Sequence, residues 1–332
     1  MKRFLTVFLC LITLCLSFAF SACGGGDKDT ITVCMPDGAP ALSMAKFMSE
    51  DTDFGRKVEY RVVGSSEIAS CVTSLDETKN ADLCVLPVNT ACKLVGDGTK
   101  YKMLGTVTHG NLFIAAAADA QDLTRDNFAE EIAGKKVGVV NLPAFPGAVF
   151  KLLLSDYGVS DKVTLSPVAA TEISGTDGAL DYFVIPEPAA SLRVGNANLK
   201  LKIAGNLQSL YGEDGYPQAV LVAKASLIEN DGKFISKFME EMTAAADWLT
   251  DEGTSASTII TAIAAHYPDP ENTAPAFNEK NLTKTVIANC AVKFTGAETD
   301  KDKIIEFLRK LKAAGDAAAT EVAESFFYNG SK

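Results

Sequence analysis

The sequence predicts an α/β fold of two similar lobes, each with a mainly parallel central sheet flanked by helices. The first observation is an internal echo. DLCVLPVNTACKLVG (82–96) returns as DYFVIPEPAASLRVG (181–195), with six identical positions in register. The second is that short β-type runs alternate with helix-type runs, which is typical of parallel sheets with right-handed crossovers. The third is a pair of strand-like segments, 105–117 and 215–223, that can cross between the lobes.

The echo extends over three strand–loop–helix units that occur twice in the same order. The offset between the copies stays between about 99 and 106 residues. Chance could produce any one of these matches. Three matches in the same order and in register favour two lobes of similar build. Because loops after the carboxyl ends of parallel strands line a crevice, the two sets of loops should face a common cleft. The matching pairs are 31–48 with 135–154, 57–68 with 162–173, and 82–96 with 181–195.

The remainder of the chain, from Lys224 on, is helical in character and has no counterpart in the second copy. Apolar residues recur there at spacings of three and four, which predicts helices with one buried face. We therefore expect these helices to pack around the first lobe. They fall at 234–249, 258–267 and 302–314. The predicted domain bounds are 31–112 with 217–332 for lobe I, and 113–216 for lobe II.

The N-terminus is typical of an export signal. A basic start precedes the uncharged apolar run 4–20, and small residues then lead to a cysteine followed by glycines. This order resembles a bacterial lipoprotein signal, with residues 1–22 removed and Cys23 lipidated. Residues 23–30 would then be a flexible tether, and the chain would be held on the extracytoplasmic face of the cell membrane. An uncleaved anchor is the alternative, although 17 apolar residues is short for a span.

The charge balance excludes one class of partner. The formal net charge is −11, and removal of the signal with Lys2 and Arg3 leaves −13. No cluster of Lys and Arg follows the signal, so the sequence has no electrostatic footprint for nucleic acid. The negative balance supports solubility and does not identify a ligand.

Catalytic signatures are mostly absent. The sequence has no GxSxG elbow, no HExxH and no phosphate-binding loop that ends in GK[ST]. With only two histidines, a multi-histidine metal site is not available, and we expect neither metal nor cofactor. His266, on an apolar helical stretch, is interpreted as structural. His109 lies on a crossing segment, where ligand contact and plain packing or hinge duty both stay open.

The cysteines do not form a recognisable framework. Beyond Cys23 they lack CxxC spacing and lie mostly in apolar runs, which favours buried, small hydrophobic side chains. A single disulfide stays open, because its pairing cannot be read from sequence. These five cysteines are Cys34, Cys71, Cys84, Cys92 and Cys290.

Several predicted helix N-termini are aimed at the cleft. Free backbone N–H groups at such ends bind polar or anionic groups without a charged side chain. Gly38 and Gly147 permit close approach of a backbone. Ordinary turn and cap chemistry is the alternative for each loop. The loops are 36–40, 65–66, 89–90, 145–147 and 170–171.

Single aromatic and acidic residues permit two interpretations. Phe145, at a loop tip, could stack on a ligand or close over it, and core packing is the alternative. Tyr216, beside a crossing segment, leaves the same choice. Trp248 lies on an apolar helical stripe and is expected in the core. Asp82 and Asp181 open their strands on the side away from the cleft and are expected to cap them.

Five stretches, together with the lipoprotein-like signal and the two lobes, carry a family resemblance. They are PDGAPALSMAKFM (36–48), ADLCVLPVN (81–89), VTHGNLFIA (107–115), DYFVIPEPAAS (181–191) and YPQAVLVAKASLIEN (216–230). They resemble the solute-binding lipoproteins of ABC importers, in the branch for aliphatic sulfonates, nitrate, taurine and thiamine-precursor pyrimidines. The resemblance implies the periplasmic-binding-protein type II fold and closure of a monomer around one small molecule. It also implies docking on a membrane permease driven by a cytoplasmic ATPase.

The family's ligand loops, carried over to this sequence, fall at the same loops that the predicted helix N-termini indicate. These loops contain no arginine, but they do contain Asp37 and Glu187. Carboxylates that face a bare anion would repel it. We therefore expect a neutral or cationic polar organic ligand, such as a heteroaromatic vitamin precursor, with amines and sulfonates as further classes. The predicted ligand-binding residues are Asp37, Gly38, Ala39, Ser65, Ser66, Asn89, Phe145, Pro146, Gly147 and Glu187, with His109 and Tyr216 from the crossing segments.

Two other functions fit the same fold, because fold does not determine function. One is an enzyme that acts on a small metabolite, similar to thiamine-pyrimidine synthases or chorismate dehydratases. Those enzymes work in the cytoplasm, so the export signal disfavours this alternative. The other is a lipoprotein that senses a ligand or serves a surface partner.

Overall fold

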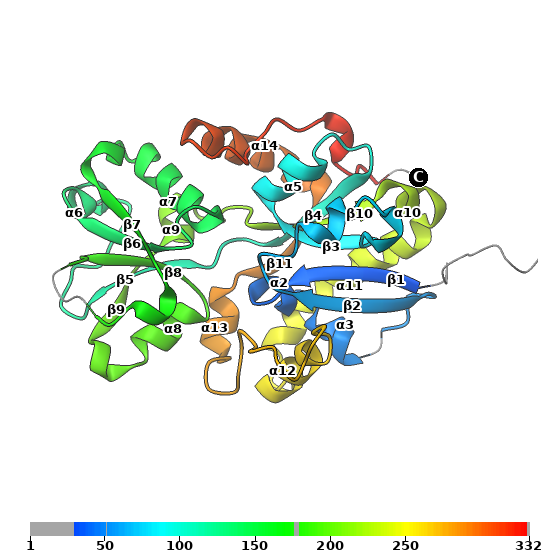
Figure 1. The fold of residues 1–332 in the computed structure, drawn as a ribbon, viewed down its shortest axis with the longest axis horizontal. Helices are drawn as coiled ribbons and strands as arrows, with labels where there is room; N and C mark the ends of the chain where they lie inside the picture. The colour runs from blue at the N-terminus through cyan, green and yellow to red at the C-terminus, as the bar shows by residue number, and fades with distance from the viewer. Residues whose placement is uncertain (1–29, 51, 176–178, 331–332) are drawn as a thin grey trace, which may run out of the picture.

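The computed structural model describes residues 30–50, 52–175 and 179–330 (Figure 1). The predicted signal, Cys23 and almost all of the tether lie outside these residues. Two separate β-sheets form the centres of two lobes, and helices cover both (Figure 1). Across the described part of the chain, no helix combines the length and apolar character that a membrane crossing needs.

The first sheet has six strands in the order β11-β4-β10-β3-β1-β2. Strand β1 is parallel to β2 and β3, whereas β10 is antiparallel to β3 and β4, and β11 is antiparallel to β4. The strands are β1 (Thr30–Pro36), β2 (Lys57–Val63), β3 (Leu83–Pro87), β4 (Tyr101–Thr108), β10 (Ala219–Lys224) and β11 (Val292–Gly296).

The second sheet repeats the first with five strands in the order β7-β6-β8-β5-β9. Strand β6 is parallel to β7 and β8, and β5 is antiparallel to β8 and β9. In the first sheet the antiparallel strand beside β3 is β10, and in the second sheet the antiparallel strand beside β8 is β5. Each of these two strands forms the end of a crossing segment. The predicted fold class is confirmed. The strands are β5 (Leu112–Ala117), β6 (Lys136–Val140), β7 (Thr164–Val168), β8 (Tyr182–Pro186) and β9 (Leu201–Asn206).

The helices cover the faces and ends of both sheets. Around the first sheet lie α2 (Ala39–Leu42), α3 (Ala45–Glu50), α4 (Ser70–Thr73), α5 (Val88–Val95), α10 (Ala225–Asn230), α11 (Gly232–Thr250), α12 (Ala256–Ala264), α13 (Lys284–Asn289) and α14 (Ala297–Ala313). Around the second lie α6 (Phe128–Ile132), α7 (Phe145–Asp156), α8 (Ala189–Val194) and α9 (Leu207–Tyr211). Short 3-10 turns fall at Glu77–Lys79, Ser160–Lys162, Ala170–Glu172, Ala197–Leu199 and Glu324–Phe326.

The first crossing segment differs from its prediction as one strand. It is divided into β4 and β5 by a turn at residues 109–111. Gly110 has a φ of 104°, a conformation that residues with a Cβ rarely adopt. A Cβ there would also lie 2.5 Å from Cγ of Gln208. The chain can therefore change sheets at this point because the residue is glycine.

Two stretches form shorter helices than their residue patterns predict. The apolar spacing over 41–48 predicts one helix, but the chain forms α2 and α3, and between them the Ser43 hydroxyl donates to the Pro40 carbonyl at 2.6 Å. The serines at 65–66 predict a helix from Glu67, but α4 begins only at Ser70 with Ala69 as its N-cap.

The two lobes also repeat this local chemistry after their second strands. The Glu67 carboxylate accepts from the Gly64 N–H at 3.4 Å, and the Glu172 carboxylate accepts from the Ala169 N–H at 3.3 Å. Each carboxylate folds back over the turn that precedes it. The first copy then leads into the short α4, and the second into a 3-10 turn.

The C-terminal helices do not all stay with the first sheet. Helices α11 and α12 contact α3 as expected, but α14 contacts both β4 and α7 of the second lobe (Figure 1). Lys310 of α14 pairs with Asp156 at 3.0 Å, and Lys303 pairs with Asp214 at 2.9 Å. The largest hydrophobic core contains residues of both lobes as a result. Helix α14 is therefore a bridge between the lobes.

Asp82 and Asp181 hold matching strand ends together, as expected for capping residues. The Asp82 carboxylate accepts from the Thr32 N–H at 2.9 Å, while its own N–H donates to the Thr32 carbonyl at 2.9 Å. Asp181 makes the same two bonds with Lys136, at 2.8 Å each. The repeated aspartate therefore fastens the third strand to the first in both sheets.

Substitution of these two aspartates should have unequal effects. Asp82 is less exposed and also pairs with Lys224 at 2.9 Å, whereas Asp181 is exposed. We expect Asp82→Ala to lower the free energy of unfolding by about 1–3 kcal/mol, and Asp181→Ala by about 0.5–1.5 kcal/mol. Urea unfolding of the two variants measures the difference. An equal loss in both would contradict the added role of Lys224.

Candidate functional site

The two crossing segments lie side by side and form a ribbon between the lobes. The Tyr216 N–H donates to the His109 carbonyl at 3.4 Å, and the Gln218 N–H donates to the Thr108 carbonyl at 3.0 Å. The Gln218 side chain donates to the Asn111 side chain at 2.9 Å. Backbone and side-chain bonds therefore join the two segments at their centre, which we call the crossing ribbon (residues 108–111 and 215–218).

Loops from both lobes are fastened to the crossing ribbon at equivalent places. The Val88 N–H, at the start of α5, donates to the Gln218 carbonyl at 2.9 Å. The Glu187 N–H, directly after β8, donates to the Asn111 carbonyl at 3.0 Å. Val88 and Glu187 occupy the same position in the sequence echo. The ends of the third strands therefore meet at the ribbon from opposite sides.

Glu187 links the two lobes through its side chain. It is only 3% exposed, and one carboxylate oxygen accepts from the Ser191 N–H at 3.0 Å. The other oxygen accepts from the Ser191 hydroxyl at 2.7 Å and from the Asn289 amide at 2.7 Å. Asn289 is the last residue of α13, which belongs to the first lobe. The Glu187–Asn289 bond is therefore a contact between the lobes.

Asn89 is bonded to a different part of the chain. Its amide group is buried in α5, where its oxygen accepts from the Thr90 N–H at 2.8 Å. Its nitrogen donates to the Asp316 carboxylate at 2.7 Å. Asp316 lies just beyond the bridging helix α14. The side chains of Asn89 and Glu187 thus both tie loops to C-terminal segments of the chain.

Asp37 fastens the first loop to the segment between α12 and α13. One oxygen accepts from the Gly38 N–H at 2.7 Å. The other accepts from the Tyr267 hydroxyl at 3.0 Å and from the Ala276 N–H at 2.8 Å. Burial, together with the Asp37 carboxylate, raises the pKa of Tyr267, so its hydroxyl stays a donor. Gly38 has a φ of 97° and Ala39 is buried directly behind it.

Ser65 and Ser66 are exposed in the turn after β2. They do not cap α4, because that helix begins four residues later with Ala69 as its N-cap. Their hydroxyls lie at the surface of the first lobe, and their role in ligand contact stays a prediction.

The aromatic residues of the predicted site lie in a core between the lobes. Phe145 is 8% exposed, and its ring centroid lies 6.3 Å from that of Tyr216. Tyr216 is fully buried and stacks on Phe307 of α14, with centroids 5.7 Å apart and an angle of 13°. Phe145, in the first turn of α7, also lies 6.3 Å from Phe307. Phe145 and Tyr216 therefore pack in a core, which is the alternative to ligand contact that the sequence left open for both residues.

Pro146 and Gly147 shape the first turn of α7. Proline is suited to this position because the first N–H groups of a helix have no partner within it. A Cβ on Gly147 would lie 1.9 Å from the Leu142 carbonyl oxygen. Gly147 is therefore required by the packing of its own loop.

His109 lies against β11. Its Nε2 is 3.1 Å from the Lys293 carbonyl and 3.3 Å from the Thr295 hydroxyl. Burial lowers the pKa of His109, which favours the neutral ring. The carbonyl requires the ring proton on Nε2. This geometry fits a packing and hinge role at the crossing ribbon.

Three residues that the sequence analysis did not select contribute polar groups here: Asn111, Gln218 and Asn289. The Gln218 side-chain oxygen is buried and has no hydrogen-bond partner among the described residues. The available signal was a single amide within each apolar crossing run, HGNLF (109–113) and YPQAV (216–220). No comparable signal marks Asn289, which the tertiary fold brings to Glu187.

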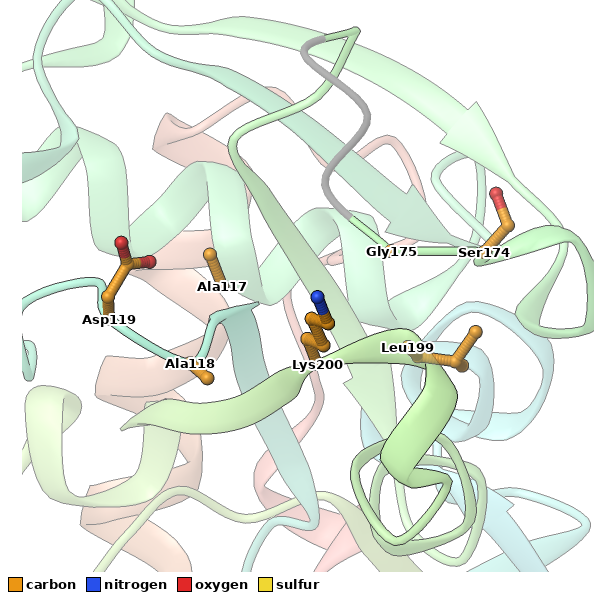
Figure 2. Close-up of a pocket in the computed structure, with 7 residues that line it drawn as sticks. All are labelled: Ala117, Ala118, Asp119, Ser174, Gly175, Leu199 and Lys200. Carbon is orange, nitrogen blue, oxygen red and sulfur yellow. The ribbon is translucent and has the colours of Figure 1, made fainter.

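Three surface cavities lie away from the predicted ligand residues. The cavity in Figure 2, of about 410 Å³, opens where β5 ends and β9 begins. It is lined by Ala117, Ala118, Asp119, Ser174, Gly175, Leu199 and Lys200. A second, of about 410 Å³, lies between α7 and the end of α14, and a third, of about 490 Å³, lies beside α5. None of these three is lined by a predicted ligand residue.

The described residues also include no group of three or more His, Cys, Asp or Glu side chains that could hold a metal ion. The five cysteines in this part of the chain are buried and free. The polar side chains at or beside the crossing ribbon include those of His109, Asn111, Gln218 and Glu187.

Comparison with known proteins identifies the architecture. No protein-family model matches the sequence. No curated protein matches it either. Among solved structures, an ABC transporter protein from Parabacteroides distasonis superposes with a TM-score of 0.69 at 19% identity, covering 91% of this chain and 99% of that one.

Two further structures agree. The periplasmic aliphatic sulphonate binding protein SsuA from Escherichia coli gives a TM-score of 0.61 at 13% identity, covering 86% of this chain and 87% of that one. The SsuA protein from Xanthomonas axonopodis bound to MOPS gives 0.56 at 13% identity, covering 87% and 94%. At these identities the likeness shows the fold alone: the chain has the periplasmic-binding-protein fold.

Proposed function

We propose that this chain is an extracytoplasmic solute-binding protein of an ABC importer. It would capture a small polar organic molecule between its lobes and deliver it to a membrane permease with a cytoplasmic ATPase. One observation carries the proposal: loops from both lobes are fastened to a single crossing ribbon, which we propose as the hinge for lobe closure. Structural neighbours described as ABC transporter and sulphonate-binding proteins support it.

The proposed organisation follows the sequence. Residues 1–22 would be removed as a signal, Cys23 would carry the lipid anchor, and the tether would end at residue 30. Lobe I would comprise 31–112 and 217–332, and lobe II 113–216. The mature protein would work as a monomer.

The proposed mechanism is hinge closure at the crossing ribbon. A ligand shifts the equilibrium between open and closed lobes by binding the closed state more tightly. The Glu187–Asn289 bond already joins the lobes, and the aromatic core of Phe145, Tyr216 and Phe307 joins them at α14. The proposed ligand walls are the loops at 37–39, 65–66, 89, 145–147 and 187.

The charges of the site favour a neutral or cationic ligand. The hydrogen-bond donors to the Glu187 and Asp37 carboxylates are neutral hydroxyl, amide and N–H groups. These donors hold the two carboxyl groups in place, and among the described residues no Lys or Arg forms an ion pair with either of them. The free side-chain oxygen of Gln218 could accept a hydrogen bond from an N–H or O–H group of the ligand. A ligand with donors, such as an aminopyrimidine vitamin precursor or an amine, suits this chemistry.

A thermal-shift screen tests the function. The panel contains thiamine-precursor pyrimidines, amines, taurine, alkanesulfonates and nitrate. We expect one donor-bearing neutral or cationic compound to raise the melting temperature, because a ligand at 100 times its Kd stabilises the folded state by about 2.7 kcal/mol. Glu187→Gln should reduce that shift, whereas Glu130→Gln, on the exposed surface of α6, should leave it unchanged.

Two results would reject the proposal. One is a panel in which no compound changes the melting temperature. The other is a turnover assay in which the bound compound is consumed, since that outcome favours an enzyme on the same fold. A shift by a bare anion alone, such as nitrate, would keep the binding function but contradict the expected ligand class.

The cross-lobe bond gives a second test. Asn289→Ala removes the amide that bonds Glu187 and leaves a buried carboxylate oxygen with one donor fewer, so the closed arrangement should become less favourable. We expect the radius of gyration of the ligand-free protein, measured by small-angle X-ray scattering, to increase. Asn230→Ala is the control, because Asn230 bonds only within its own helix at the Ser226 carbonyl. Identical scattering from both variants would show that Asn289 does not hold the lobes together.

A further inference from the structure

Helices α14 and α13 cover opposite faces of the first sheet. Val220 and Val222 of β10 pack in the same core as α14. Ala219 and Leu221, which alternate with them, pack in the same core as α13. Because successive side chains of a strand point to opposite faces of its sheet, the two helices lie on different sides. In Figure 1, α14 lies above the crossing segments and α13 lies below them.

The second sheet is divided in the same way. Val184 of β8 packs in the core that contains α7, α9 and α14. Phe183 and Ile185, on the other face of β8, pack with α8. The lobes therefore meet twice, once where α14 lies against α7 and α9, and once where Glu187 bonds Asn289 of α13. We call these sides the α14 face and the α13 face.

The contacts on the two faces differ in kind. On the α14 face, a single apolar core contains residues of both lobes. The ring centroid of Phe307 lies 5.6 Å from that of Tyr211 and 6.3 Å from that of Phe145, and both partners belong to the second lobe. On the α13 face, the described residues of each lobe form a core of their own. The Glu187–Asn289 hydrogen bond joins the lobes there.

Two ion pairs add to the contact on the α14 face. Lys310 pairs with Asp156 at 3.0 Å, and Lys303 pairs with Asp214 at 2.9 Å. Asp156 ends α7 and Asp214 follows α9, so both carboxylates belong to the second lobe. The Lys310 ammonium also lies 5.4 Å from the ring centroid of Tyr211. Aromatic packing and ion pairs together hold α14 on the second lobe.

We propose that the contact of α14 with the second lobe opposes closure of the lobes on the α13 face, so that the balance of the two contacts sets how far the lobes close. A bend about the crossing ribbon that brings α8 closer to α13 separates α14 from α7 and α9, because the two contacts lie on opposite sides of the ribbon. Such a bend exposes apolar surface on the α14 face, which costs free energy.

This opposition would also limit ligand affinity. A ligand that binds the closed state must supply the free energy of the contact that closure breaks, so a strong contact on the α14 face lowers the apparent affinity. The inference rests on the hinge closure proposed above, but it does not depend on which solute binds or on an importer.

A distance measurement between α8 and α13 tests the proposal. Spin labels are attached to bioorthogonal residues at positions 192 and 285, which are exposed on α8 and α13. The full-length protein without added solute is then measured by double electron–electron resonance. Lys303→Gln/Lys310→Gln removes both ion pairs to the second lobe. We expect the population at shorter distances to increase about two- to fivefold, a modest change because these ion pairs are partly exposed.

The matched control changes two other lysines of the same helix. Lys301 and Lys312 pair with Glu324 and Glu321, which lie in the C-terminal segment. That segment is attached to β4 of the first sheet. Lys301→Gln/Lys312→Gln therefore makes the same change of charge on α14 without removing a contact to the second lobe. It should leave the distance distribution unchanged.

Salt gives a readout that needs no change in α14. Raising the NaCl concentration from about 0.05 M to about 1 M should shift the labelled, otherwise unaltered protein toward shorter distances, because salt screens exposed ion pairs. The proposal is overturned if both double variants give the same distribution, if Lys303→Gln/Lys310→Gln shifts it to longer distances, or if salt has no effect. A solute screen without any thermal shift would reject the proposed function and leave these distances unchanged.

Discussion

The arrangement of this molecule depends on the hydrogen bonds that join its two crossing segments. Each lobe fastens the end of its third strand to the crossing ribbon through one backbone bond, Val88 to Gln218 in the first lobe and Glu187 to Asn111 in the second. The Gln218–Asn111 side-chain bond lies between these two attachments. A rotation of the lobes would therefore change the backbone of residues 108–111 and 215–218, and it would also change the contacts that α14 makes with the second lobe. Gly110 and Gly215 each have a positive φ and no room for a Cβ, so other residues could not easily occupy these two positions of the ribbon.

The two copies of the repeated unit have kept the same framework and differ where they face each other. Asp82 and Asp181 make the same pair of bonds at the far ends of their strands. At the near ends, Val88 is buried in its own lobe, whereas Glu187 reaches Asn289 of the other lobe. This difference makes the cleft asymmetric. Glu187 also affects a neighbouring group. Burial is the main cause of the raised pKa of Cys290, and the Glu187 carboxylate raises it further.

Much of the framework could be predicted from sequence because it rests on local patterns. Alternating apolar runs give the strands, and the echo pairs β1, β2 and β3 with β6, β7 and β8. The partners of the site residues could not be predicted in this way. Glu187 and Asn289 are 102 residues apart, and Asn89 and Asp316 are 227 apart, with no pattern that relates them. The helix pattern over 41–48 is interrupted at Ser43, whose hydroxyl donates to the Pro40 carbonyl, and this local bond could not be predicted from the spacing of apolar residues. The ligand roles of Ser65 and Ser66 stay predictions.

The polarity of the cleft follows from how its carboxylates are held. A buried carboxylate can be stabilised by a cation or by several neutral hydrogen-bond donors. The two arrangements differ in the net charge, and so in the electric field, around the carboxylate. An Arg or Lys partner would cancel the negative charge of the carboxylate, which would then have little effect on whether a charged ligand binds. Ser191, Asn289, Tyr267 and backbone N–H groups orient Glu187 and Asp37 without cancelling their charge. The same neutral donors that make these side chains structural therefore leave them without a charged partner of their own. Under the proposed function, Glu187 would be both a contact between the lobes and a determinant of ligand charge, since the first role uses its lone pairs and the second uses its electric field.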